Sequence, residues 1–204
     1  MIIAAIFGIS VSALAQVKFG VKAGANVSYL SGIDYSDGRG ATGSTLSARS
    51  LHLGGYANYF FNDLLGAQTE AVFSMQGGKY TVANVTGTLY LNYINVPLLL
   101  EIKPFKSPFS LFVGPQLGYC VGRSLLDDLR PTINKDHYKD FDFAIAWGMQ
   151  FGLTEHLKLG FRHNIGLTPS LKYNNEYDFE GTHYKRIVKG ERNNVLHLSI
   201  GWTF

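Results

Sequence analysis

The C-terminal residues 194–204 constrain the fold more than any other stretch, because apolar residues alternate there with small or polar ones. Successive side chains of a β-strand point to opposite faces, so this stretch would have one apolar face and one mostly polar face. An apolar face that ends in aromatic residues is typical of a barrel strand that faces lipid and carries an aromatic girdle. The apolar positions are Leu196, Leu198, Ile200, Trp202 and Phe204.

The same alternation recurs along the whole chain. The expected strands are residues 17–29, 48–60, 64–76, 88–102, 109–119, 141–152, 156–166 and 194–204. Their connections alternate between long (30–47, 77–87, 120–140 and 167–193) and short (61–63, 103–108 and 153–155). An even strand count with long outer loops and short periplasmic turns is the pattern of outer-membrane barrels, and no stretch shows the apolar period of a helix. The sequence therefore predicts an all-β fold, an eight-stranded antiparallel up-and-down transmembrane β-barrel.

One expected strand is less regular than the others. Alternation blurs within residues 88–102, which contain Pro97. Because proline has no backbone N–H to donate to a neighbouring strand, we expect a bulge or a local break at this position.

The apolar row could face either lipid or the barrel interior. A soluble lipocalin-like barrel encloses its apolar row and exposes many charged residues to water. Here the opposite row is rich in glycine and alanine with few charges, and such residues fit inside a narrow barrel. We therefore expect the aromatic side chains to face lipid and the ionic ones to face the axis. The first group includes Phe143, Trp147, Phe161 and Trp202, and the second includes Glu70, Asp142 and Arg162.

The ionisable residues of the inner row are expected to form a charge-paired network in the lumen. They are Lys22, Glu70, Asp142, Lys158, Arg162 and His197. Buried charges need partners, and the interior of an eight-stranded barrel is just wide enough for side chains to fill it. The network would then close the lumen as a plug, and the alternative is a path for small solutes or protons.

The N-terminal residues 1–15 are expected to be a cleaved signal peptide, followed by a barrel domain over residues 17–204. They form an apolar run that ends in Ala13-Leu14-Ala15, a small-x-small cleavage site. A retained transmembrane anchor is the alternative, but the run is too short for one. The net charge of +3 is too small to indicate nucleic-acid binding, and the single Cys120 excludes an intramolecular disulfide framework.

Four stretches resemble an outer-membrane β-barrel family of Bacteroidota that is often labelled PorT-like. They are residues 18–28, 93–100, 112–119 and 201–204. The resemblance spans nearly the whole expected barrel, and it implies an outer-membrane location and barrel architecture. It also leaves open a role as a subunit of a secretion complex. The terminal pair Trp202 and Phe204 is similar to the signal that barrel-assembly machinery reads in other outer-membrane proteins.

The last long connection combines aromatic and basic residues. They are Tyr173, Tyr177, Phe179, Tyr184, Lys185, Arg186, Lys189 and Arg192. Aromatic platforms with cations could bind sugars, lipopolysaccharide phosphates or a partner protein. The alternative is a solvated loop that extends the barrel wall as a β-ribbon.

Catalytic, metal and cofactor sites are not expected, because no motif supports them. The acidic and histidine residues of the long connections are Asp127, Asp128, Asp136, His137 and His183, and they lack a diagnostic spacing. We expect a structural or binding protein that contacts outer-membrane lipid and lipopolysaccharide. Its role would be membrane integrity, adhesion or partner docking. A solute channel, a secretion subunit and an enzyme at the outer rim are the alternatives.

Overall fold

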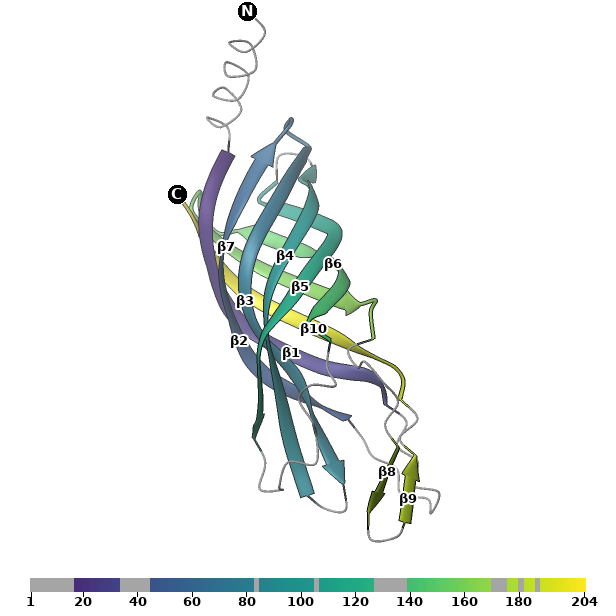
Figure 1. The fold of residues 1–204 in the computed structure, drawn as a ribbon. Coiled ribbons are helices and arrows are strands. Elements are labelled where there is room, and N and C mark those ends of the chain that lie inside the picture. The colour runs from purple at the N-terminus through teal and green to yellow at the C-terminus, as the bar shows by residue number, and fades with distance from the viewer. Residues whose placement is uncertain are drawn as a thin grey trace, which may run out of the picture.

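Eight long strands close into an antiparallel barrel, in which each strand pairs with the next barrel strand along the chain and the last pairs with the first (Figure 1). The computed structural model describes residues 17–33, 45–82, 85–104, 107–126, 139–169, 176–179, 182–185 and 188–204, so the expected signal peptide lies outside the described residues. The order around the barrel is β1-β10-β7-β6-β5-β4-β3-β2. The barrel strands are β1 (Val17–Ile33), β2 (Thr45–Phe60), β3 (Leu65–Val82), β4 (Val85–Ile102), β5 (Phe109–Leu126), β6 (Phe141–Gly152), β7 (Leu157–Gly166) and β10 (Val188–Thr203). This architecture confirms the predicted fold class.

The two rows of side chains point in the predicted directions. The apolar row forms an exposed belt around the barrel: Phe143 is 40% exposed, Trp147 43%, Phe161 38% and Trp202 48%. The ionic row is buried inside, where Arg162 is only 2% exposed. Such a belt around a polar interior is the arrangement of barrels that lie in lipid. In the part of the chain that the structure describes, no helix is long and apolar enough to cross a membrane.

The two ends of the barrel differ. The short connections, residues 61–64, 103–108 and 153–156, lie at the same end as the C-terminus, and we call it the turn end. At the opposite end, which we call the loop end, β8 (Glu176–Phe179) and β9 (Thr182–Lys185) form a separate two-stranded sheet (Figure 1). The last long connection therefore contains a β-ribbon, although the ribbon is not paired with the barrel wall.

Several strands extend further toward the loop end than the sequence predicts. The predicted long connection at residues 77–87 is wrong, because β3 and β4 stay paired as far as Val82 and Val85. Likewise β1 continues to Ile33, β5 continues to Leu126 and β10 already begins at Val188. Beyond the apolar belt both faces of a strand can be polar. Backbone pairing then continues without the alternation that marks a strand in the sequence.

Pro97 coincides with a local break in the sheet and not with a bulge. It pairs with Gln116 of β5 without a register shift, while the pairing of β4 with β3 is interrupted beside it. The predicted local break is therefore present, but the bulge lies elsewhere. Val121 of β5 is the extra residue, between the partners of Asn92 and Tyr93.

Candidate functional site

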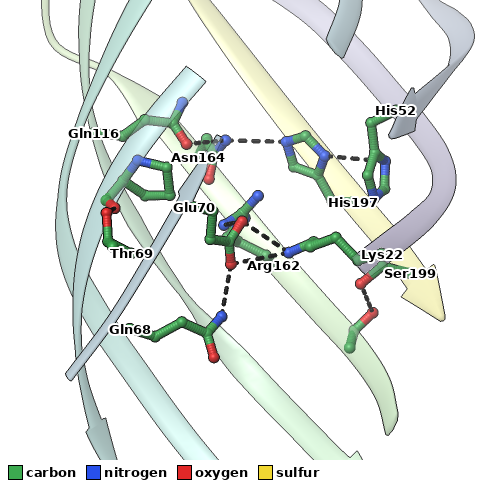
Figure 2. Close-up of polar contacts among 12 residues, drawn as sticks. Lys22, His52, Gln68, Thr69, Glu70, Gln116, Arg162, Asn164, His197 and Ser199 are labelled. Atoms are coloured by element: carbon green, nitrogen blue, oxygen red, sulfur yellow. Dashed lines mark hydrogen bonds and ion pairs between the residues drawn. The ribbon is translucent and has the colours of Figure 1, made fainter. Parts of the chain in front are cut away.

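The centre of the lumen holds a carboxylate that binds two cations (Figure 2). Nζ of Lys22 donates to both carboxylate oxygens of Glu70 at 3.0 and 2.9 Å, and Nη1 of Arg162 donates to Oε2 at 2.9 Å. Nε2 of Gln68 completes the set by donating to Oε1 at 2.7 Å. The side chain of Glu70 is fully buried and those of Lys22 and Arg162 are 10% and 3% exposed. We call these four residues the Glu70 cluster.

The Glu70 cluster reaches across the whole barrel. Glu70 lies on β3 and Arg162 on β7, and four strand-to-strand steps separate these strands in either direction around the barrel. Lys22 approaches from β1, midway between them. The cluster carries two positive charges and one negative charge. Within the described residues, Nε and Nη2 of Arg162 have no hydrogen-bond acceptor.

A second polar group lies beside the Glu70 cluster and is built around two histidines (Figure 2). The two N–H groups of the Asn26 amide are shared among three acceptors, the carbonyls of Leu51 and Met75 and the hydroxyl of Ser74. Its amide oxygen is therefore free to accept from Nδ1 of His52 at 2.6 Å, which assigns the ring proton to that nitrogen.

The second histidine joins this group to the opposite wall. The ring of His197 meets that of His52 edge to face, with centroids 4.9 Å apart. Its Nε2 lies 3.0 Å from the amide nitrogen of Asn164, and that nitrogen also donates to Gln116 at 3.0 Å. Side chains from β1, β2, β3, β5, β7 and β10 thus fill this part of the lumen.

Toward the turn end a second carboxylate is bound by neutral donors. Glu101 accepts from the hydroxyl of Ser110 and from the amide of Gln150, both at 2.6 Å, and also from the amide of Asn58. Sequence reasoning missed Glu101, because alternation blurs in β4. The sequence spacing could have identified it, because Glu101 lies four residues after Pro97, and residues separated by an even number of positions lie on the same face of a strand. Pro97 faces inward, so Glu101 does too.

The expected six-residue charge network does not form as one unit. Lys22, Glu70 and Arg162 are brought together, whereas the other three residues have other partners. Asp142 accepts from the hydroxyl of Thr168 at 2.8 Å, and Lys158 lies over the ring of Tyr56 at 5.6 Å from its centroid. His197 belongs to the histidine group. Alternation predicts the face on which a side chain lies but not its height, which depends on strand register.

The inner face also carries an apolar cluster. Leu99, Phe112 and Ala146 pack together, each 8% exposed or less. This cluster comes from β4, β5 and β6, on the side of the barrel away from Lys22. Apolar and polar side chains together therefore occupy the lumen.

The aromatic and basic residues expected to bind a ligand are distributed over the ribbon and β10. Tyr177 and Phe179 lie on β8, Tyr184 and Lys185 on β9, and Tyr177 pairs with Tyr184. Lys189 and the exposed Arg192 lie on β10, whereas Tyr173 and Arg186 lie outside the described residues.

The residues considered for catalysis are not brought together by the described structure. His183 lies on β9 opposite Asp178. Asp127, Asp128, Asp136 and His137 lie outside the described residues. Across the described ranges, no three His, Cys, Asp or Glu side chains gather as a metal site would require.

The two aromatic residues of the C-terminal strand lie on the outer surface at the turn end. Trp202 is 48% exposed and Phe204 73% exposed. The backbone N–H of Thr203, between them, donates to the carbonyl of His156 at 2.8 Å. In return Nδ1 of His156 donates to the carbonyl of Thr203, also at 2.8 Å.

Comparisons with known proteins agree with this architecture. The family whose model matches, over residues 1–204, is described as the outer membrane protein beta-barrel domain. A search of curated protein sequences found no match.

Three solved structures illustrate the likeness in fold. The attachment invasion locus protein Ail of Yersinia pestis is 11% identical, with 93% of this chain and 99% of that chain covered and a TM-score of 0.47. OprG of Pseudomonas aeruginosa is 16% identical, with 92% and 95% covered and a TM-score of 0.45. Neisserial surface protein A is 17% identical, with 91% and 97% covered and a TM-score of 0.46.

Proposed function

Because the chain belongs to the outer membrane protein β-barrel domain family, we propose that this outer-membrane protein is a closed barrel with a structural or binding role at its loop end. The role is non-catalytic. It comprises membrane integrity, adhesion or the docking of a partner outside the membrane. Outer-membrane lipid and lipopolysaccharide are its constant surroundings.

The observation that best supports a closed lumen is the ion pair between Glu70 and Arg162. It joins strands on opposite sides of the barrel, so it crosses the lumen at its centre. Lys22 reaches the same carboxylate from a third strand, Gln68 binds it from β3, and the histidine group and the apolar cluster of Leu99, Phe112 and Ala146 fill other parts of the lumen. A solute would have to displace buried, charge-paired side chains, which is energetically costly.

Single-channel recordings in planar bilayers test this closure. The full chain should give no stable open state of porin size. The double variant Glu70→Ala with Arg162→Ala removes the ion pair that crosses the lumen, and its conductance is compared with that of the unmodified chain. A stable open state in the unmodified protein would establish the alternative, a small-solute channel.

Support for binding at the loop end comes from the folded structure that projects there. β3, β4 and β5 continue beyond the apolar belt, and the ribbon lies at the same end (Figure 1). The ribbon and the start of β10 carry aromatic and basic residues such as Tyr177, Tyr184 and Lys185. Cations beside aromatic rings suit lipopolysaccharide phosphates, sugars or an acidic partner.

Deletion of residues 173–189 tests the loop-end role. The truncated protein should bind lipopolysaccharide-coated surfaces less than the full chain, with equal binding of both proteins to bare surfaces. Heat-modifiability on gels shows whether the truncated barrel still folds. Equal binding of a folded truncation to lipopolysaccharide would refute a role for this segment.

The narrower assignments form part of the same proposal. The likeness of residues 18–28, 93–100, 112–119 and 201–204 to PorT-like proteins supports membership of that group. The apolar run that ends in Ala13-Leu14-Ala15 supports export by a cleaved signal peptide at residues 1–15. Trp202 and Phe204 at the exposed end of β10 suit recognition by barrel-assembly machinery. A secretion-complex subunit should retain partner proteins during purification from native membranes, and purification without partners would contradict that role.

A further inference from the structure

A small cavity lies in the lumen between the Glu70 cluster and the turn end. Its volume is about 20 Å³. Charged or polar side chains from six strands line it together with two glycines: Lys22, Tyr56, Gln68, Gln150, Lys158, Ser199, Gly160 and Gly201. A cavity needs roughly 10–15 Å³ to hold one water-sized particle, so this one has room for a single small ligand.

Both charged residues at the cavity are cationic. The ammonium group of Lys22 is engaged by Glu70, whereas the ammonium group of Lys158 has only the face of the Tyr56 ring beside it. Among the described residues, no carboxylate lies within ion-pair distance of Lys158. The nearby carboxylate of Glu101 is instead bound by neutral donors, including Gln150 of the cavity wall.

This arrangement leaves a positive charge without a direct counter-charge inside a narrow barrel. Removing an ammonium group from water costs free energy, and a partner of opposite charge offsets this cost. Lys158 is half-buried, and the face of an aromatic ring offsets only a part of the cost. The hydroxyl of Tyr56, which shares a hydrogen bond with Thr203, and the second amide N–H of Gln68 add donors at the same wall, whereas the hydroxyl of Ser199 donates to the carbonyl of Gly160. The cavity therefore combines positive charge, hydrogen-bond donors and the size of one small particle.

A glycine keeps the cavity open. A Cβ atom added to Gly201 would lie 3.5 Å from the carbonyl oxygen of Val21 and 3.6 Å from Tyr56, which is ordinary contact. An alanine at position 201 therefore fits without a shift of the backbone, and its methyl group would occupy space in the cavity. This position offers a way to fill the cavity without changing any charge.

We propose that the cavity between Lys22 and Lys158 is a binding site for one small monovalent inorganic anion of chloride size. The two ammonium groups hold the anion, and the hydroxyl of Tyr56 donates a hydrogen bond to it while accepting one from the hydroxyl of Thr203. Larger anions such as sulfate do not fit. The bound anion completes the charge balance of the lumen below the Glu70 cluster and leaves the lumen closed.

Bromide titration of the full chain, refolded in detergent micelles free of halide, tests the proposal. Sodium bromide should shift the amide resonances of Lys158, Ser199 and Gly201 saturably, whereas sodium sulfate at equal ionic strength should not. Lys158→Met removes the free charge and Gly201→Ala fills the space. Each variant should weaken bromide binding by about tenfold or more, which corresponds to roughly 1.4 kcal/mol.

Two matched controls separate the site from general effects. Lys103 lies over the ring of Phe60 at 5.9 Å, outside the cavity, so Lys103→Met removes an equivalent cation without affecting bromide binding. Gly55 faces outward with space for a Cβ atom, so Gly55→Ala should likewise leave binding unchanged. Heat-modifiability on gels verifies that every variant folds. The proposal is overturned if bromide gives no saturable shift, or if folded Lys158→Met and Gly201→Ala proteins bind bromide as the unmodified chain does.

Discussion

The imidazole of His156 lies flat against the indole of Trp202, with ring centroids 5.2 Å apart and an interplanar angle of 18°. His156 belongs to the turn between β6 and β7, and it also exchanges two hydrogen bonds with the backbone of Thr203. A single turn residue thus holds the end of the closing strand through its ring and its backbone.

Replacing His156 by alanine should therefore weaken closure at the turn end. Loss of the ring contact and one hydrogen bond should lower the free energy of unfolding by about 1–2 kcal/mol. Urea unfolding from lipid vesicles, followed by tryptophan fluorescence, measures the change. His163→Ala is the matched control, because His163 touches Trp147 with centroids 5.8 Å apart but lies away from the chain end. An equal loss in both variants would contradict a specific role for His156.

Neutralising the central carboxylate should be more damaging. Glu70→Gln keeps the shape of the side chain but leaves Lys22 and Arg162 without their counter-charge. Breaking a buried ion pair from one side costs about 3–5 kcal/mol, so the urea midpoint should fall markedly. Glu155→Gln in the exposed turn should change stability by less than about 0.5 kcal/mol. If the Glu70→Gln barrel is as stable as the unmodified one, the charge of Glu70 does not stabilise the barrel through Lys22 and Arg162.

Close approach of neighbouring strands makes one inner glycine irreplaceable. A Cβ atom on Gly24 would lie 1.9 Å from the carbonyl oxygen of Leu198, so the backbone itself would have to move. Gly24→Ala should cost at least about 3 kcal/mol or prevent folding. Gly55→Ala on the outer face of the adjacent strand should fold normally. The yield of the heat-modifiable form after refolding distinguishes the two, and similar yields would argue against the strand spacing described for β1 and β10.

A charge placed on the apolar belt tests contact with hydrocarbon directly. Leu198 is 63% exposed near the middle of β10, whereas Leu153 is 48% exposed in a turn at the end of the barrel. Leu198→Arg should cost about 2–4 kcal/mol in vesicles, and Leu153→Arg about 0–1 kcal/mol. Equal effects of the two substitutions would mean that the belt does not face lipid.

The fold and the direction of the side chains follow from alternation, which the sequence displays directly. Residues such as Phe143, Trp147 and Arg162 lie on the predicted faces, because a strand with lipid on one side and a lumen on the other must alternate. Strand ends were harder to predict. Gly77 and Gly78 interrupt the alternation of β3, so the segment from Gly77 to Val82 resembles a loop in composition although its backbone is paired.

The contacts within the lumen could not be derived from the pattern. Glu70 and Arg162 are separated by 92 positions, and their meeting depends on the registers of every ladder between them. Asp142 lies on the correct face but at another height, where Thr168 is its partner. Glu101 was hidden by the irregular pattern around Pro97, although its burial places it among the carboxylates of the lumen with Glu70 and Asp142.

The placement of Glu70 and Arg162 on opposite walls has a kinetic consequence. Neither residue can reach the other until the sheet from β3 to β7 has curled, so we expect the pair to form late in assembly. Interactions absent from the transition state slow unfolding and leave the folding rate nearly unchanged. The ion pair should therefore act as a latch on the finished barrel, lengthening its lifetime in the membrane without hastening its insertion.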